Sequence, residues 1–107
     1  LRNGVAVSIA MTYDAAAVPG LNAVVAAGGS VRLLHGESPR YIHAKLLAID
    51  AGSSSQRAFV GSENLSAASL LHDRELGIVL LQPRLVATVA MTIDTDLRDG
   101  QPWMSRA

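Results

Sequence analysis

The sequence predicts an α/β fold, with a mixed β-sheet layered between helices. Short apolar segments typical of strands occur along the chain with two longer segments whose apolar residues recur at helical spacing. Stretches rich in glycine, proline and serine separate these segments. The chain has 107 residues, 50% of them hydrophobic, which is enough to bury a core. We therefore expect a single domain over residues 1–107.

Five segments are predicted as strands: residues 4–10, 31–34, 41–49, 57–60 and 76–81. The first alternates apolar residues with small or polar ones, which predicts a strand with one buried face. The third, Tyr41–Ile49, has apolar residues on both faces, a pattern typical of a strand buried within a sheet. The serine-rich turn over Ala51–Gln56 joins it to the fourth, so the two are expected to form a hairpin.

Two helices are predicted to cover the sheet. One spans Pro19–Ala27, and the other begins at Pro83 and reaches about Leu97. A shorter helix and two loops are expected at residues 65–71, 35–39 and 100–103. Leu1–Gly4 has the pattern of a last helical turn ended by glycine. Because the chain also lacks an initiating Met, we expect it to continue upstream of its first residue.

Composition argues against several classes of function. Nine basic and nine acidic side chains give a formal net charge of zero, without the basic excess that nonspecific nucleic-acid binding needs. The absence of cysteine excludes a disulfide framework, a thiolate zinc site and a cysteine nucleophile. No apolar run approaches the roughly 18 residues that span a bilayer. The spacing of His35, His43 and His72 matches no metal-ligand pattern, so we expect no metal and no cofactor.

Two side chains of the predicted third strand are the strongest candidates for chemistry. His43 and Lys45 stand two residues apart, so on a strand they project from the same face. Lys45 is the single lysine among the nine basic residues. Two cationic groups side by side repel each other unless they face an anion, and we expect a phosphate. Asp50 falls on the opposite face, roughly 20 Å further along, so we expect it to anchor the following turn instead.

The predicted site continues after the hairpin, in the sequence Gly-Ser-Glu-Asn. Gly61 permits close approach of the backbone, and Ser62 and Asn64 offer neutral donors and N–H groups to an oxyanion. Glu75 precedes the fifth strand. Its carboxylate is expected to accept the Nδ1 proton of His43, which leaves Nε2 free as a nucleophile.

Each candidate also has a structural interpretation. A histidine in a buried strand is more often a core residue than a nucleophile. A lysine such as Lys45 often protects a sheet edge, and Glu75 has Arg74 as a neighbouring charge partner. The combination of His43 and Lys45 with the later Gly61–Asn64 segment favours the functional interpretation.

Together these residues resemble the HKD motif of the phospholipase D superfamily. The motif segments H-x-K-x(4)-D, G-S-x-N and R-E-L-G-I fall at His43 to Asp50, Gly61 to Asn64 and Arg74 to Ile78. The resemblance extends over most of the chain. Two features depart from it: the ten residues between Asp50 and Gly61 make a longer hairpin than is common, and Asp73 stands where relatives often have Asn.

The resemblance implies one half of a phospholipase D-like pseudo-twofold fold that exchanges phosphodiesters through a phosphohistidine, without metal. His43 would attack phosphorus or protonate the leaving alkoxide. The other implied roles are charge neutralisation by Lys45 and Asn64, phosphate binding by Gly61 and Ser62, and orientation of His43 by Glu75. One motif supplies one histidine and the reaction needs two. The implied partner is therefore an N-terminal HKD half of the same protein, or a homodimer mate, and the C-terminal half alone would be inactive.

The substrate implied by the resemblance is a phospholipid or another phosphodiester, turned over by a phosphodiesterase or phosphatidyltransferase. An HKD-type nuclease is the alternative, and the neutral charge makes a nucleic-acid partner the weaker expectation. A third possibility is a half that only binds phosphate or acts as a scaffold. The presence of His43, Lys45 and Asn64 together favours an active site over this third function.

Overall fold

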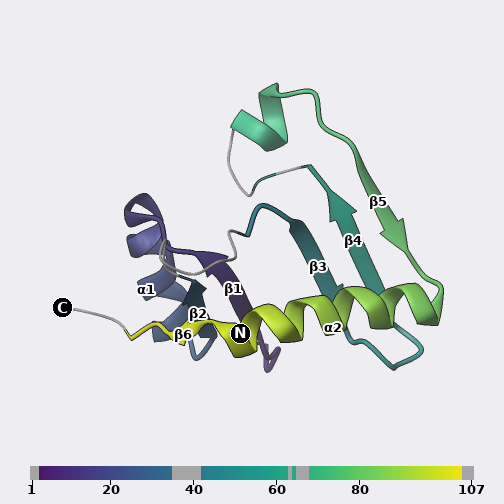
Figure 1. Cartoon of the computed structure of the whole chain (residues 1–107), viewed down its shortest axis with the longest axis horizontal. Coiled ribbons are helices and arrows are strands. Elements are labelled where there is room, and N and C mark those ends of the chain that lie inside the picture. Colours follow the sequence, from purple (N-terminus) through teal and green to yellow (C-terminus); the bar gives the residue numbers. More distant parts are fainter. Residues whose placement is uncertain (1–2, 35–41, 63, 65–67, 105–107) are drawn as a thin grey trace. The chain divides into compact units, whose positions relative to one another are not determined.

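The computed structural model describes residues 3–34, 42–62, 64 and 68–104, and divides into two compact units (Figure 1). Unit 1 comprises Leu1–Ile42 and Asp94–Ala107, and unit 2 comprises His43–Ile93. Each unit contains a three-stranded sheet and its own buried cluster. Strands and helices are mixed in the order that the sequence predicts, so the α/β fold class is confirmed.

Unit 1 is built on a β-α-β segment. Strand β1 (Ser8–Thr12) pairs in parallel with β2 (Ser30–Leu34), and helix α1 (Val18–Ala26) connects them. A 3₁₀ turn precedes α1, and the carboxylate of Asp14 caps this turn by accepting from the backbone N–H of Ala16 at 3.0 Å. The short strand β6 (Gln101–Pro102) adds antiparallel to β2, which makes this sheet mixed.

The core of unit 1 lies between α1 and the sheet. Leu21, Val31 and Leu33 are each at most 4% exposed. The helical spacing in the predicted 19–27 segment is confirmed, because Leu21 is buried and Val24 and Val25 pack against the same cluster. Trp103 closes the cluster, and its indole Nε1 donates to Oδ1 of Asn22 at 3.0 Å.

Strand β1 is displaced along the sequence from its predicted position at 4–10. Its pairing starts at Ser8 because β2 begins opposite, at Ser30, and it continues to Thr12 because β2 runs on to Leu34. A strand ends where its partner ends, and the alternation of apolar residues does not encode that limit.

Gly100 is held tightly against β2. Its carbonyl oxygen accepts two hydrogen bonds from the guanidinium of Arg32, at 3.1 Å from Nε and 2.6 Å from Nη2. A Cβ at position 100 would lie 3.1 Å from Cβ of Arg32 and 3.3 Å from the backbone nitrogen of Leu33. Those contacts are closer than van der Waals distances, so this glycine lets the exit of α2 pack on the sheet.

We predict that Gly100→Ala lowers the free energy of unfolding by about 1–3 kcal/mol, since the backbone of β2 must move to admit the methyl group. The measurement is a urea unfolding midpoint. Gly20→Ala is the matched control, because a Cβ at this position on α1 meets nothing within 4 Å. That change is expected to stabilise by about 0.5–1 kcal/mol through the helix preference for alanine. Equal midpoints for the two variants would contradict the prediction.

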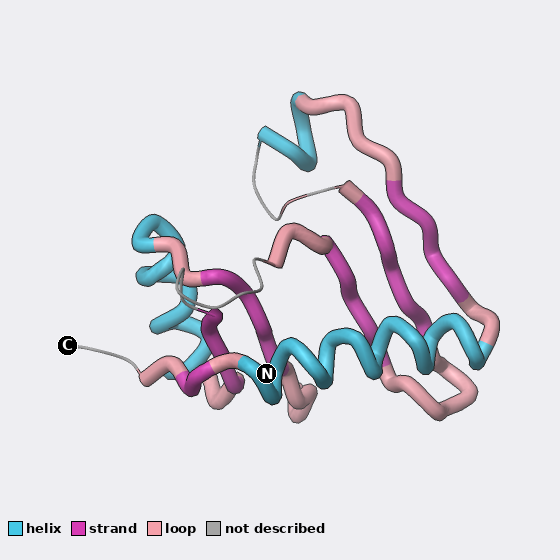
Figure 2. The backbone as a smooth tube through the Cα atoms, in the orientation of Figure 1, coloured by secondary structure: helices cyan, strands magenta, loops and turns pink. Residues whose placement is uncertain are grey.

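Unit 2 is an antiparallel sheet of β3 (Lys45–Ile49), β4 (Arg57–Gly61) and β5 (Gly77–Leu80), in that order across the sheet. The predicted hairpin between the first two is confirmed, and Figure 2 shows its turn. Helix α2 (Pro83–Asp99) covers one face, where Val86 and Val89 are buried. The strand residues packed there are Leu46, Ala48, Ala58 and Leu80.

The expectation for the third predicted strand is partly wrong. Strand β3 begins at Lys45, so His43 precedes the strand, and Tyr41 lies outside the described residues. Within the described sheet β3 is an edge strand, with Leu47 52% and Ile49 45% exposed. Apolar residues on both faces of β3 do not mean that both faces are buried. Within unit 2, helix α2 packs against the face that carries Leu46 and Ala48, and Leu47 and Ile49 are on the other face.

The remaining elements mostly follow the predicted pattern. Helix α2 runs two residues beyond its predicted end, and the predicted exit segment includes β6. In the described part of the predicted 65–71 helix, a single π-helical turn spans Ala68–His72. Residues 65–67, the predicted loop at 35–39, and Leu1 and Arg2 lie outside the described residues. Gly4 has φ 78°, the left-handed conformation of a helix-ending glycine. No helix among the described residues has the length and apolar character needed to cross a membrane.

Candidate active site

The register of the sheet in unit 2 gathers the predicted site residues at one end. Lys45, the first residue of β3, pairs with Gly61, the last of β4, and Gly61 pairs with Gly77, the first of β5. Segments flanking this row therefore lie at the same end of the sheet. They are the residues just before β3, just after β4 and just before β5, namely His43, Ser62 with Asn64, and Glu75.

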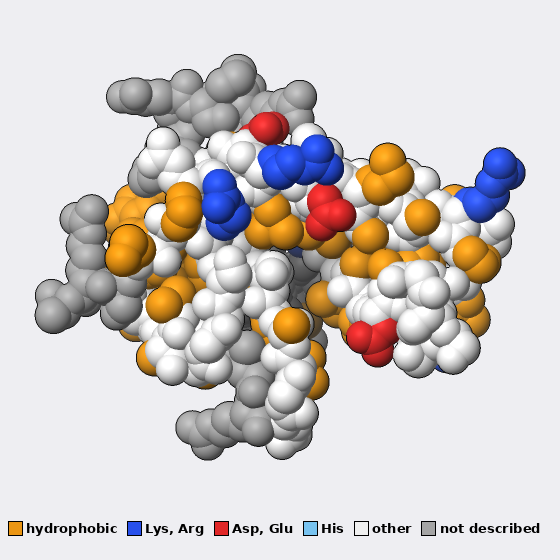
Figure 3. All heavy atoms as spheres, turned by 90° about the horizontal axis from the view of Figure 1, so that it is seen from below, with side chains coloured by type: hydrophobic (Ala, Val, Ile, Leu, Met, Phe, Trp, Pro, Cys, Tyr) orange, Lys and Arg blue, Asp and Glu red, His pale blue; other side chains and the backbone are white. Residues whose placement is uncertain are grey.

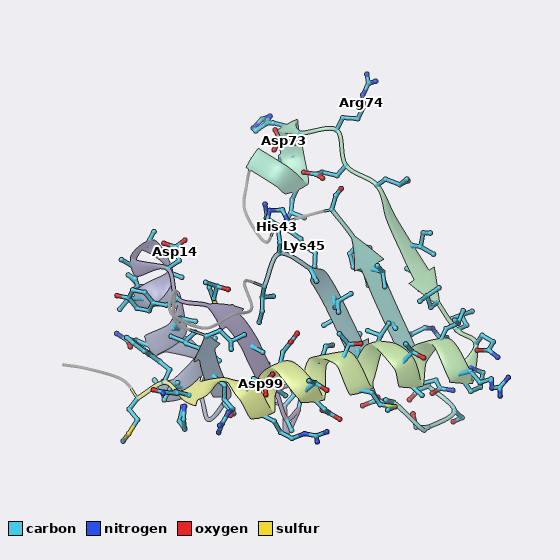
Figure 4. All side chains as sticks on the ribbon, viewed as in Figure 1. Asp14, His43, Lys45, Asp73, Arg74 and Asp99 are labelled. Carbon is cyan, nitrogen blue, oxygen red and sulfur yellow. The ribbon has the colours of Figure 1, made fainter. Side chains whose placement is uncertain are left out.

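His43 and Lys45 are in direct contact, as Figure 4 shows. The Nζ of Lys45 lies 2.6 Å from the carbonyl oxygen of His43 and 3.1 Å from its ring Nδ1. The lysine side chain thus turns back along the chain from the start of β3. His43 is exposed and Lys45 is half-buried, which leaves the imidazole accessible beside a fixed ammonium group.

This contact has a consequence for the imidazole ring. An ammonium group can only donate, so Nδ1 of His43 accepts and the proton of the neutral ring is on Nε2. The sequence predicts instead that Nδ1 donates to Glu75. One ring nitrogen either accepts or donates, so it serves Lys45 or Glu75 at any one time. The hydrogen bond between His43 and Glu75 stays a prediction.

Glu75 is tied to Ser62. The hydroxyl of Ser62 donates to Oε2 of Glu75 and accepts from the backbone N–H of Leu76 at 3.1 Å. The backbone N–H of Ser62 donates to the carbonyl of Leu76, also at 3.1 Å. These bonds continue the β4–β5 pairing by one residue and hold the side chain of Glu75 at the end of the sheet.

The predicted phosphate donors are placed differently from one another. Gly61 is paired within the sheet on both sides, and both donor groups of Ser62 are engaged with Glu75 and Leu76. This differs from the expected N–H groups exposed to an oxyanion. Asn64 is exposed and lies just beyond β4, at the same end of the sheet. Phosphate binding by Gly61, Ser62 and Asn64 stays a prediction.

Asp50 lies at the opposite end of β3 from Lys45, at the first residue of the hairpin turn. Its φ is 48°, in the left-handed region that non-glycine residues rarely adopt. Its carbonyl accepts from the hydroxyl of Ser53 at 2.7 Å, and its carboxylate accepts from the hydroxyl of Ser55 at 3.3 Å. The partner of the carboxylate is therefore a side-chain hydroxyl of the turn. The turn role that we expect for Asp50 fits this position.

We predict that Asp50→Asn leaves catalytic turnover within about twofold of the wild type. Asparagine adopts the left-handed conformation at least as readily as aspartate, and its amide oxygen still accepts from Ser55. The measurement is the steady-state rate on a phosphodiester substrate. Asp50→Val is the comparison variant, which is expected to lower the unfolding midpoint because a β-branched residue is strained at this φ. A large loss of kcat in a folded Asp50→Asn protein would show that the carboxylate takes part in the reaction.

Arg74 and His72, which come shortly before β5, do not join the site. Arg74 extends away from His43 and Lys45 in Figure 4, and His72 is exposed at the end of the π-helical turn. Among the described residues, no group of three His, Asp or Glu side chains is arranged to hold a metal ion.

Sequence reasoning missed two backbone contributors to the site. Leu76 supplies both the N–H and the carbonyl that hold Ser62, and Gly77 is the register partner of Gly61. The available signal was the glycine in the R-E-L-G-I segment, since a strand glycine often marks a close approach of backbones.

The fold of the two units and the segments around His43 fit one half of a phospholipase D-like domain. Residues 2–97 match the family described as cardiolipin synthase, PLD-like domain, and the chain belongs to this family. The resemblance to the phospholipase D superfamily is thereby confirmed, and this membership supports phosphodiesterase or phosphotransferase activity. Comparisons with curated proteins and with solved structures found no match.

Proposed function

We propose that this chain is the C-terminal HKD half of a phospholipase D-like enzyme that cleaves or exchanges phosphodiesters through a phosphohistidine. The observation that carries the proposal is the imidazole of His43 beside the ammonium of Lys45, at 3.1 Å, in a chain of this family. The family description supports a phospholipid as the substrate. No metal and no other cofactor is needed for this reaction.

The reaction proceeds in two steps. One histidine attacks phosphorus, a P–N bond forms, and the P–O bond to the leaving alcohol breaks while a second histidine gives its proton to the leaving oxygen. Water or an acceptor alcohol then attacks phosphorus, and the P–N bond breaks while the second histidine takes up the proton. His43 is one of the two histidines. Lys45 and Asn64 neutralise the charge that develops on the phosphoryl oxygens, and Glu75 orients His43.

The two-histidine requirement is the reason for proposing a partner half. This sequence contains one H-x-K motif, so the second catalytic histidine comes from an N-terminal HKD half of the same protein or from a homodimer mate. Two related halves meeting around a twofold axis bring one histidine each to a shared phosphate.

A nuclease is the second candidate function. It shares the chemistry but requires a surface that attracts a polyanion. On the face drawn in Figure 3, Lys and Arg side chains of the described residues are interspersed with Asp and Glu. Together with a net charge of zero, this favours a phospholipid ester over nucleic acid as the substrate. The presence of both His43 and Lys45 favours an enzyme over a half that only binds phosphate.

The test is an assay of the natural full-length protein on phosphatidylcholine vesicles with and without ethanol, and on single-stranded DNA. Formation of phosphatidylethanol supports a phosphatidyltransferase, because the acceptor alcohol replaces water in the second step. Cleaved DNA without lipid turnover would reject the phospholipid substrate in favour of a nuclease. Turnover of neither substrate, nor of a simple phosphodiester such as bis(p-nitrophenyl) phosphate, would reject the enzyme.

A further inference from the structure

We infer that Ser62 is a positioning residue for Glu75 and that its hydroxyl does not bind the substrate phosphate. The inference rests on the proposed function, because it assigns a role within that reaction. It differs from the interpretation suggested by the Gly-Ser-Glu-Asn pattern, in which Ser62 donates to an oxyanion.

The hydrogen-bonding capacity of the Ser62 hydroxyl limits what else it can bind. A serine hydroxyl has one proton to donate, and Ser62 donates it to Oε2 of Glu75. The backbone N–H of Ser62 is also engaged, with the carbonyl of Leu76 at 3.1 Å. Both donors of this residue are therefore used within the protein. A phosphate could accept the hydroxyl proton only by displacing the carboxylate of Glu75.

Ser62 is itself held in place by the backbone of the next strand segment. Its Oγ accepts from the backbone N–H of Leu76 at 3.1 Å, so the hydroxyl is held between the end of β4 and the segment leading into β5. The adjacent pair Gly61 and Gly77 continues the ladder into the sheet. A hydroxyl fixed on both sides holds the carboxylate of Glu75 in one orientation. The conformational entropy of ordering this side chain is then not lost again when substrate binds.

The location of the Glu75 carboxylate connects it to the proposed site. Glu75 stands two residues before Gly77 and is anchored by Ser62, which lies one residue beyond the row of Lys45, Gly61 and Gly77. This is the end of the sheet where His43 and Lys45 meet. A negative group held there compensates the ammonium of Lys45 and, in the proposed reaction, orients the imidazole of His43. Loss of Ser62 should therefore affect turnover through Glu75 and not through the affinity for substrate.

The experiment is a double-mutant cycle in the natural full-length protein, with bis(p-nitrophenyl) phosphate as the substrate. Ser62→Ala is expected to lower kcat about tenfold and to leave KM within about twofold, since a charge-assisted hydrogen bond is lost but no phosphate contact. Ser62→Thr, which keeps the hydroxyl, is expected to recover most of the rate. Adding Ser62→Ala to Glu75→Ala is expected to cause no further loss, because the two residues act as one unit.

Ser55→Ala is the matched control. This serine also donates to a carboxylate, that of Asp50, but at the opposite end of the β3–β4 hairpin. Its loss is expected to leave kcat and KM unchanged, so a reduced kcat in Ser62→Ala cannot be assigned to the loss of any surface hydroxyl.

The outcomes separate the inference from the function on which it rests. Additive losses in the Ser62→Ala and Glu75→Ala cycle, or a raised KM with unchanged kcat, would overturn the positioning role and return Ser62 to phosphate binding. A wild-type protein that turns over neither this substrate nor a phospholipid would overturn the proposed function itself.

Discussion

His43→Asn is expected to abolish phosphodiester turnover, with kcat reduced by about 10³-fold or more, while the free energy of unfolding stays near that of the wild type. An amide cannot form the covalent bond to phosphorus and cannot give or take a proton near neutral pH. The side chain is exposed and precedes β3, so its replacement removes little packing. The measurements are the steady-state rate on bis(p-nitrophenyl) phosphate in the full-length protein and a urea unfolding curve.

His72→Asn is the matched control for this variant. His72 is also exposed in unit 2, at the end of the π-helical turn, but belongs to no part of the proposed site. Its substitution is expected to leave kcat within about twofold of the wild type. If His43→Asn retained substantial turnover, or if both substitutions reduced it equally, His43 would not be one of the two reacting histidines.

The contact between His43 and Lys45 was predictable because the two residues are close in the sequence. A spacing of two residues predicted that His43 and Lys45 lie together, and the structure places Lys45 Nζ 3.1 Å from the imidazole ring. The contact is reached by a different route from the expected one. His43 stands before the strand, and Lys45 turns back to its carbonyl oxygen, because β3 begins only where its partner β4 ends.

The roles of residues joined across the sheet were less predictable. Ser62 is hydrogen-bonded to Glu75 and Leu76, which are 13 and 14 residues away along the chain. The register of β4 against β5 decides that meeting, and the sequence pattern alone does not give the register. For the same reason the exposure of Leu47 and Ile49 was missed, since it depends on which face of the sheet α2 covers.

The fold class and the helices followed from periodicity with smaller errors. The spacing of Leu21, Val24 and Val25 identified α1 to within one residue at each end, because an apolar stripe on a helix reports directly on the face that packs. The strand β6 escaped prediction. It is two residues long and contains Pro102, and it is defined by the backbone of β2 and not by a pattern of its own.

Lys45→Met is expected to lower kcat/KM by about 10²–10³-fold, in line with the loss of one well-placed charge at a reacting phosphate. Methionine keeps the length and the apolar stem of the side chain, so the half-buried position stays filled. It loses the donor that contacts the carbonyl and Nδ1 of His43. Lys45→Arg is expected to recover only a small part of the rate, because a planar guanidinium cannot occupy the same compact position between the two acceptors.

Arg57→Met provides the matched control, since Arg57 is a cation on the same face of the same sheet at its other end. It pairs with Ile49, four residues along β3 from Lys45, and its Nη1 donates to the carbonyl of Gln56 at 2.7 Å. Its removal changes the net charge of the protein by the same amount and is expected to leave kcat/KM within about twofold. Equal losses for the two variants would mean that general electrostatic attraction of the substrate, and not a local ammonium at the phosphate, accounts for the effect of Lys45. A loss confined to Lys45→Met would tie the stabilisation of the transition state to the end of the sheet where His43 lies.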